Sequence, residues 1–88
     1  MSLKKVHEDQ PKDFTFNSEN LKKVEEIFKR YPEKNKKSAV MPLLYLAQRQ
    51  NDNWIPLAAM KYIANYLSIS YISVYEVATF YTMYNLAP

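Results

Sequence analysis

The chain has 88 residues, a net charge of +3, and neither cysteine nor glycine. Its length allows one small domain, and the lack of cysteine excludes disulfides and thiolate metal sites. Without glycine, the backbone cannot approach phosphates as a P-loop or a dinucleotide-binding turn does, so both kinds of nucleotide site are excluded.

Residues 1–16 are predicted to form a charged, flexible arm, and residues 17–88 a helical domain. The rings of Phe14 and Phe16, at the end of the arm, are expected to tuck against the core. His7 is the only histidine of the chain. It is expected to be exposed and mobile, because a metal site needs several converging ligands.

A first helix is predicted within NSENLKKVEEIFKRYPEK, residues 17–34. Asn17 or Ser18 can cap it by accepting a hydrogen bond from an unpaired backbone N–H. Pro32 ends it, because proline disfavours helical geometry at the preceding residue. Its apolar stripe consists of Leu21, Val24, Phe28 and Tyr31.

Two further helices are predicted within KKSAVMPLLYLAQRQ, residues 36–50, and PLAAMKYIANYLS, residues 56–68. Pro42 disturbs the start of the former, which either begins near Pro42 or has a distorted first turn. Pro56, by contrast, suits the first turn of the latter.

The segment SISYIS interrupts the apolar pattern, and a fourth helix is predicted from Val74 to Tyr84. Four short helices without a convincing strand predict a small all-α bundle. Its core is expected to contain Leu43, Leu44, Met60, Ile63, Leu67, Val74 and Val77.

The fourth predicted helix is apolar around nearly its whole circumference, since its only charge is Glu76. Such a helix is expected to be buried on nearly all sides, and three short amphipathic neighbours are too few to wrap it. The excess surface indicates a partner chain or further polypeptide. Aromatic residues and methionine are enriched at interfaces, and the predicted contact residues are Trp54, Tyr75, Phe80, Tyr81, Met83 and Tyr84.

No catalytic, cofactor-binding or metal-binding residue is predicted. Glu76 could act as a general base only if it were buried beside an acid or a substrate. A lone glutamate on the polar strip of a helix is far more often solvated. The serines and threonines have no histidine near them in the sequence, because His7 lies in the arm.

Three motifs stand out in residues 14–88: SAVMPLL.LAQRQ, a tryptophan followed by AM..IA..L, and VYEVATFYTMYNL. Together they resemble the N-terminal helical region of the E subunit of bacterial NADH–quinone oxidoreductase, which is the 24 kDa subunit of mitochondrial complex I. The chain looks closest to the mitochondrial and alphaproteobacterial forms.

The resemblance implies that a thioredoxin-like domain, binding one [2Fe–2S] cluster through cysteines, follows the helical region. It also implies a partner subunit that binds FMN and NADH. Since the chain has no cysteine, no cluster ligand carries over, and we expect a fragment that binds none of these cofactors and is inactive alone.

Within the complete oxidoreductase, the helical domain is expected to dock on the flavin-bearing subunit and to support the cluster domain. The enzyme would pass electrons from NADH to quinone. It would lie peripherally at the cytoplasmic side of the bacterial inner membrane, or on the matrix side in mitochondria. No membrane insertion is expected, because no apolar run approaches the roughly 18 residues that a spanning helix needs.

Alternatives remain open. Related subunits serve NAD-linked hydrogenases and formate dehydrogenases. The stretch MKYIANYLSISYISVYEVATFY also mimics a helix-turn-helix, but its second helix offers Ser73, Glu76, Thr79 and Thr82 and no Lys, Arg, Asn or Gln. Contacts to bases and phosphates normally need such donors, so no nucleic-acid partner is expected. A generic interaction bundle would fit the periodicity equally well, and only the motifs argue against it.

Overall fold

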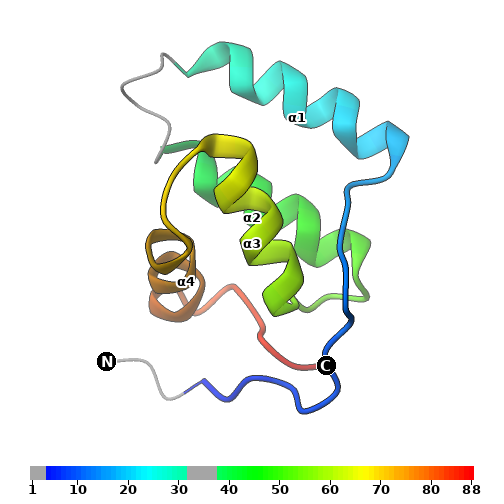
Figure 1. Ribbon diagram of the computed structural model, residues 1–88, viewed down its shortest axis with the longest axis vertical. Helices are drawn as coiled ribbons and strands as arrows, with labels where there is room; N and C mark the ends of the chain where they lie inside the picture. The colour runs from blue at the N-terminus through cyan, green and yellow to red at the C-terminus, as the bar shows by residue number, and fades with distance from the viewer. Residues whose placement is uncertain (1–3, 32–37) are drawn as a thin grey trace.

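The computed structural model describes residues 4–31 and 38–88. In these ranges it has no strand and four helices: α1 (Ser18–Arg30), α2 (Val40–Gln50), α3 (Leu57–Leu67) and α4 (Tyr71–Phe80). Helix α3 packs against both α2 and α4, and α1 lies across one end of the bundle (Figure 1). The prediction of a small all-α bundle is confirmed.

The ends of α1 and α2 follow from their sequences. Asn17 caps α1, since its side-chain oxygen accepts the Asn20 N–H at 2.8 Å. Pro32, the expected stop of this helix, lies outside the described residues. Helix α2 begins at Val40 after a tighter 3₁₀ turn at Ser38 and Ala39. Pro42 therefore falls in the first turn, where backbone N–H groups have no acceptor within the helix.

Helix α4 begins and ends earlier than predicted. It spans Tyr71–Phe80, so the predicted range from Val74 to Tyr84 was wrong. Ser70 starts the helix, because its hydroxyl accepts the Ser73 N–H at 3.2 Å. At Tyr81 the backbone becomes extended. The spacing of apolar residues does not reveal that Ser70 caps the helix. It also does not reveal that the residues after Phe80 turn back onto the bundle.

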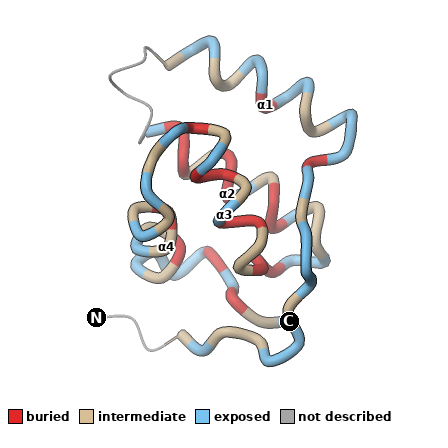
Figure 2. The backbone as a smooth tube through the Cα atoms, in the orientation of Figure 1, coloured by how far each residue is buried: buried red, intermediate tan, exposed pale blue. Residues whose placement is uncertain are grey.

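The core lies between α2, α3 and α4, and buried positions concentrate on these helices in Figure 2. Six of the seven predicted core residues are fully buried: Leu43, Leu44, Met60, Ile63, Leu67 and Val74. Val77 packs against this core while remaining partly exposed.

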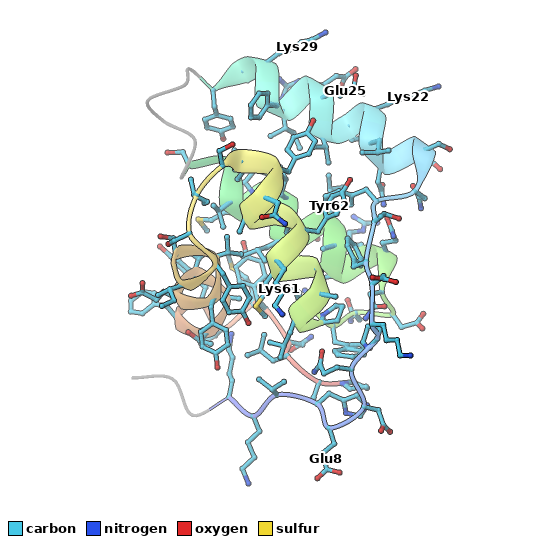
Figure 3. The ribbon with its side chains drawn as sticks, viewed as in Figure 1. Glu8, Lys22, Glu25, Lys29, Lys61 and Tyr62 are labelled. Carbon is cyan, nitrogen blue, oxygen red and sulfur yellow. The ribbon has the colours of Figure 1, made fainter. Side chains whose placement is uncertain are left out.

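Helix α1 contacts the core along one narrow stripe and otherwise faces water. Val24 is its one buried residue, while Lys22 and Lys29 extend away from the bundle (Figure 3). No helix in the described ranges is long and apolar enough to cross a membrane.

Among the described residues, three adopt a left-handed backbone conformation, although the chain has no glycine. Asp52, Asn53 and Ser68 have φ angles of 51°, 71° and 56°. Ser68 ends α3 through two hydrogen bonds, from its own N–H to the Asn65 carbonyl and from the Ile69 N–H to the Ala64 carbonyl. This is the Schellman pattern, which uses the left-handed residue to satisfy carbonyls at the end of the helix.

The described part of the arm, residues 4–16, lies along the side and the base of the bundle (Figure 1). Phe16 is buried, as expected, and packs edge-on against Tyr62 of α3. The expectation that His7 is exposed was wrong: the residue is half-buried, and its ring meets the Trp54 ring edge-on at 5.0 Å.

Candidate functional site

Three of the large apolar side chains that the described chain exposes lie around the end of α4. Phe80, Tyr81 and Met83 keep 74%, 38% and 49% of their surface exposed, and we call these three residues the α4 patch. The Phe80 and Tyr81 rings meet edge-on at 5.1 Å. The patch therefore presents three apolar side chains that the described chain leaves largely uncovered.

The patch is exposed because α4 packs through its other side. Val74 and Ala78, one turn apart, are both fully buried. Ile72, Glu76 and Phe80 follow one another at intervals of four residues on the outer row, and all three are exposed. This row offers two apolar side chains and one carboxylate.

The outer row of α4 does not suit nucleic acid. Phosphate and base contacts need cationic or amide donors, and the row provides none. In the described chain the cations of the bundle lie mainly on α1, where Lys and Glu alternate (Figure 3). The geometry therefore gives the helix-turn-helix alternative no support.

The six predicted contact residues divide into three groups in the structure. Phe80, Tyr81 and Met83 are exposed, and Tyr75 is half-buried. Trp54 and Tyr84 are buried, with 9% and 1% of their surface exposed, so the expectation that Tyr84 presents an open ring was wrong. Trp54 lies beneath the His7 ring, and the hydroxyl of Tyr84 donates to the Met41 carbonyl at 3.0 Å.

Sequence reasoning missed Gln48, which holds the residues that follow α4. This side chain is 5% exposed. Its Nε2 donates to the Met83 carbonyl at 3.1 Å, and its Oε1 accepts the Asn85 N–H at 2.6 Å. A signal was present, because Gln48 stands one turn after Leu44 on the buried row of α2, where an apolar residue is the norm.

Further contacts fix the same C-terminal segment, residues 81–86. The Ile55 N–H donates to the Asn85 carbonyl at 2.8 Å, and the Asn85 side chain donates to the Asn53 carbonyl at 3.0 Å. Leu86 is buried. The α4 patch thus stands on a base that is hydrogen-bonded to α2 and to the turn before α3.

Burial also changes two ionisable groups in this region. It raises the pKa of the Tyr84 hydroxyl, and the neighbouring Tyr81 raises it further. Burial lowers the pKa of Lys4, whose ammonium group donates to the carbonyls of Ala78, at 2.8 Å, and of Tyr81. A lysine at this end of α4 also faces the negative pole of the helix dipole.

Two shallow hollows lie away from the α4 patch. One, of about 460 Å³, separates the start of α1 from the end of α2. The other, of about 230 Å³, lies between the arm and α3 and includes Lys61 and Tyr62 (Figure 3). Neither hollow contains a histidine or a nucleophile paired with a base, so neither has the arrangement of a catalytic centre.

The chain matches the sequence model of the thioredoxin-like [2Fe-2S] ferredoxin family over residues 24–88. It is 58% identical over 74 residues to the E subunit of NADH-quinone oxidoreductase from Rickettsia conorii, covering 84% of this chain and 44% of that protein. The E subunit from Rickettsia bellii is 54% identical over 76 residues, 86% of this chain and 46% of the relative. The mitochondrial NADH dehydrogenase [ubiquinone] flavoprotein 2 of Dictyostelium discoideum is 53% identical over 72 residues, 82% of this chain and 29% of the relative.

The chain thus spans less than half the length of these relatives. The family description names an iron–sulfur group, but the residues of this chain do not fit one. The sequence has no cysteine, and the described ranges hold no cluster of histidine, aspartate or glutamate suited to a metal ion. What these residues offer instead is an apolar surface on a rigid base.

Proposed function

The chain belongs to the thioredoxin-like [2Fe-2S] ferredoxin family, and from that membership we propose that it is the N-terminal helical region of the E subunit of an NADH–quinone oxidoreductase. Its role in that complex is docking and scaffolding. The identity of 58% to such a subunit along 84% of this chain carries the assignment. The relatives described above are all subunits of NADH-quinone oxidoreductase or NADH dehydrogenase, which favours this complex over a hydrogenase or a formate dehydrogenase.

The docking surface that we propose is the α4 patch, together with the half-buried Tyr75 and with Ile72, which stands at the start of the outer row that ends at Phe80. Phe80 is 74% exposed. Covering such an aromatic side chain with a partner removes apolar surface from water, which favours binding. Aromatic residues and methionine also concentrate at the centres of protein interfaces. Tyr84 supports this surface from the core, since its ring meets the Tyr81 ring edge-on at 6.5 Å, whereas Trp54 is buried against His7.

The partner in this proposal is the subunit that binds FMN and NADH, and the cluster-bearing domain of the complete protein lies beside it. In this proposal the helical region itself holds no iron, because the sequence has no cysteine and residues 4–31 and 38–88 contain no cluster of histidine, aspartate or glutamate suited to a metal ion. The complete enzyme oxidises NADH and reduces quinone, at the cytoplasmic face of the bacterial membrane or the matrix face in mitochondria. The isolated chain is inactive.

Calorimetric titration of the chain into the purified flavin- and NADH-binding subunit tests the proposal. Phe80→Ala and Met83→Ala are each expected to weaken binding by about 1–2 kcal/mol, because truncation at the centre of an interface costs more than truncation at its rim. Tyr45→Ala is the matched control, since Tyr45 is 50% exposed but lies on α2 near α1. Absence of binding, or equal losses in all three variants, would contradict the α4 patch as the docking surface.

A further inference from the structure

The N-terminal arm reaches the start of α3 and the end of α4. Helix α3 has Pro56 at its N-cap, without any side-chain cap, and α4 ends in the extended residue Tyr81. A helix leaves its first N–H groups and its last carbonyls without intrahelical partners. Polar groups from elsewhere in the chain can therefore bond to both ends.

At α3 the arm supplies the missing acceptor. The Leu57 N–H, the first of the helix, donates to Oε1 of Gln10 at 2.9 Å. The Gln10 side chain is itself oriented by the arm, because its Nε2 donates to the His7 carbonyl at 2.8 Å. Gln10 thus acts as an N-cap from 47 positions away in the sequence.

At α4 the arm supplies a donor from outside the helix, and the Tyr81 carbonyl also accepts the Tyr84 N–H at 3.4 Å. The ammonium group of Lys4 donates to the Ala78 carbonyl, in the last turn, and to the Tyr81 carbonyl just beyond it. A positive charge is favourable at this end of a helix. Between these two contacts, the His7 N–H donates to the Leu86 carbonyl at 3.1 Å. The arm is therefore bonded to α3, to α4 and to the C-terminal segment.

From these contacts we infer that residues 4–10 act as a strap. They close the N-terminus of α3 and the C-terminus of α4, and in doing so they hold the turn that presents Phe80, Tyr81 and Met83. The positioning of the α4 patch for a partner rests on the proposed docking function. The closing of the two helix ends does not depend on it.

Amide hydrogen exchange, read residue by residue by NMR on the 88-residue chain, tests the strap directly. In Gln10→Leu the Leu57 amide loses its acceptor, and its exchange is expected to accelerate about fivefold to tenfold, the equivalent of one hydrogen bond. Gln10→Glu keeps an acceptor oxygen for the Leu57 N–H but loses the donor to the His7 carbonyl, so as the comparison variant it is expected to accelerate exchange at Leu57 less than Gln10→Leu does.

The other end of the strap is tested with Lys4→Met, which keeps the length of the side chain and removes its donor. The amides of Phe80 and Tyr81 are expected to exchange several-fold faster. Lys5→Met is the control, because Lys5 is exposed. Unchanged exchange in Gln10→Leu and Lys4→Met, or equal acceleration in the controls, would overturn the strap.

Binding of the flavin- and NADH-binding subunit separates this inference from the docking proposal. If the strap positions the α4 patch, Lys4→Met weakens that binding several-fold while Lys5→Met does not. Binding that Lys4→Met leaves unchanged, together with faster exchange at Tyr81, would overturn the positioning role. If Phe80→Ala leaves binding unchanged, the proposal that the α4 patch is the docking surface is wrong. The exchange results still decide whether the arm closes the two helix ends.

Discussion

Gln48 and Asn85, 37 positions apart in the sequence, are joined by a 2.6 Å hydrogen bond from the Asn85 N–H to Oε1 of the glutamine. The other end of the same amide donates to the Met83 carbonyl. One buried side chain therefore holds the backbone on both sides of Tyr84. Because Met83 belongs to the α4 patch, this relationship links the core of α2 to the proposed docking surface.

Replacement of Gln48 by methionine is expected to lower the free energy of unfolding by about 2–4 kcal/mol. The new side chain fills a similar volume, but it leaves the Met83 carbonyl and the Asn85 N–H without partners in a poorly hydrated site. Urea denaturation followed by circular dichroism measures the loss. Arg49→Met, on the exposed neighbouring position, is the control and should cost less than about 1 kcal/mol. Similar losses in both variants would argue against a stabilising role for the two Gln48 hydrogen bonds.

Tyr84→Phe removes only the hydroxyl that donates to the Met41 carbonyl at 3.0 Å. The ring keeps its packing, so the expected loss of stability is about 1 kcal/mol, the usual net worth of one hydrogen bond. Tyr84→Ala also removes the buried ring and should cost about 3–5 kcal/mol. Thermal or urea unfolding distinguishes the two values. A tyrosine that were exposed, as the sequence suggested, would show little loss in either variant.

Stability is expected to fall at alkaline pH, partly through Tyr84. Its pKa in the folded chain is raised above the ordinary value of 10.0 by burial and then by Tyr81. Above that ordinary value the folded chain holds more protons than the unfolded chain, so the free energy of unfolding declines as pH rises through the folded pKa. Tyr66 and Tyr71 act in the same direction, whereas Lys4, with a lowered pKa, opposes them.

The contribution of Tyr84 is isolated by comparing the parent chain with Tyr84→Phe across the alkaline range. The variant should show a shallower decline in the free energy of unfolding above the ordinary pKa of tyrosine. Tyrosinate absorbance of the folded chain gives an independent reading, because the variant should lose a late-titrating group. Parallel pH profiles for the two proteins would contradict a raised pKa at this position.

Ser68→Gly is expected to stabilise the chain by about 0.5–1 kcal/mol, since glycine adopts the left-handed conformation at φ 56° without the steric cost that serine bears. The melting temperature should rise by about 2–8 °C in a domain of this size. Asn65→Gly, inside α3, is the contrasting variant, because there glycine only adds freedom to the unfolded chain and should lower the melting temperature. A decrease in both variants would mean that the Ser68 side chain makes a contact that glycine cannot replace.

Much of the fold could be read from local patterns. The spacing of Leu43, Leu44, Met60, Ile63 and Leu67 predicted two helices and the core between them, because a helical period of about 3.6 residues puts such side chains on one face. The cap at Asn17 followed from its own side chain, which bonds only three residues ahead. In each case the physical cause lies within a few residues of its effect.

The candidate site could be read only in part. The sequence identified Phe80, Tyr81 and Met83 as apolar side chains in excess of what four short helices can bury, and the structure exposes all three. It could not separate them from Tyr84. That residue has the same chemistry, and its burial depends on a turn after α4 and on Met41, 43 positions away.

The sequence by itself thus determined the number and approximate position of the helices, the core they share, the absence of thiolate ligands and the surplus of apolar side chains near the end of the chain. The tertiary structure alone decided where α4 ends and which rings remain exposed. It also decided that the side chains of Gln48, Gln10 and Lys4 form hydrogen bonds with backbone groups far from them in sequence. The reason is physical. Periodicity and capping act over one or two turns, whereas a polar side chain that satisfies a distant N–H or carbonyl finds it only after the helices have packed.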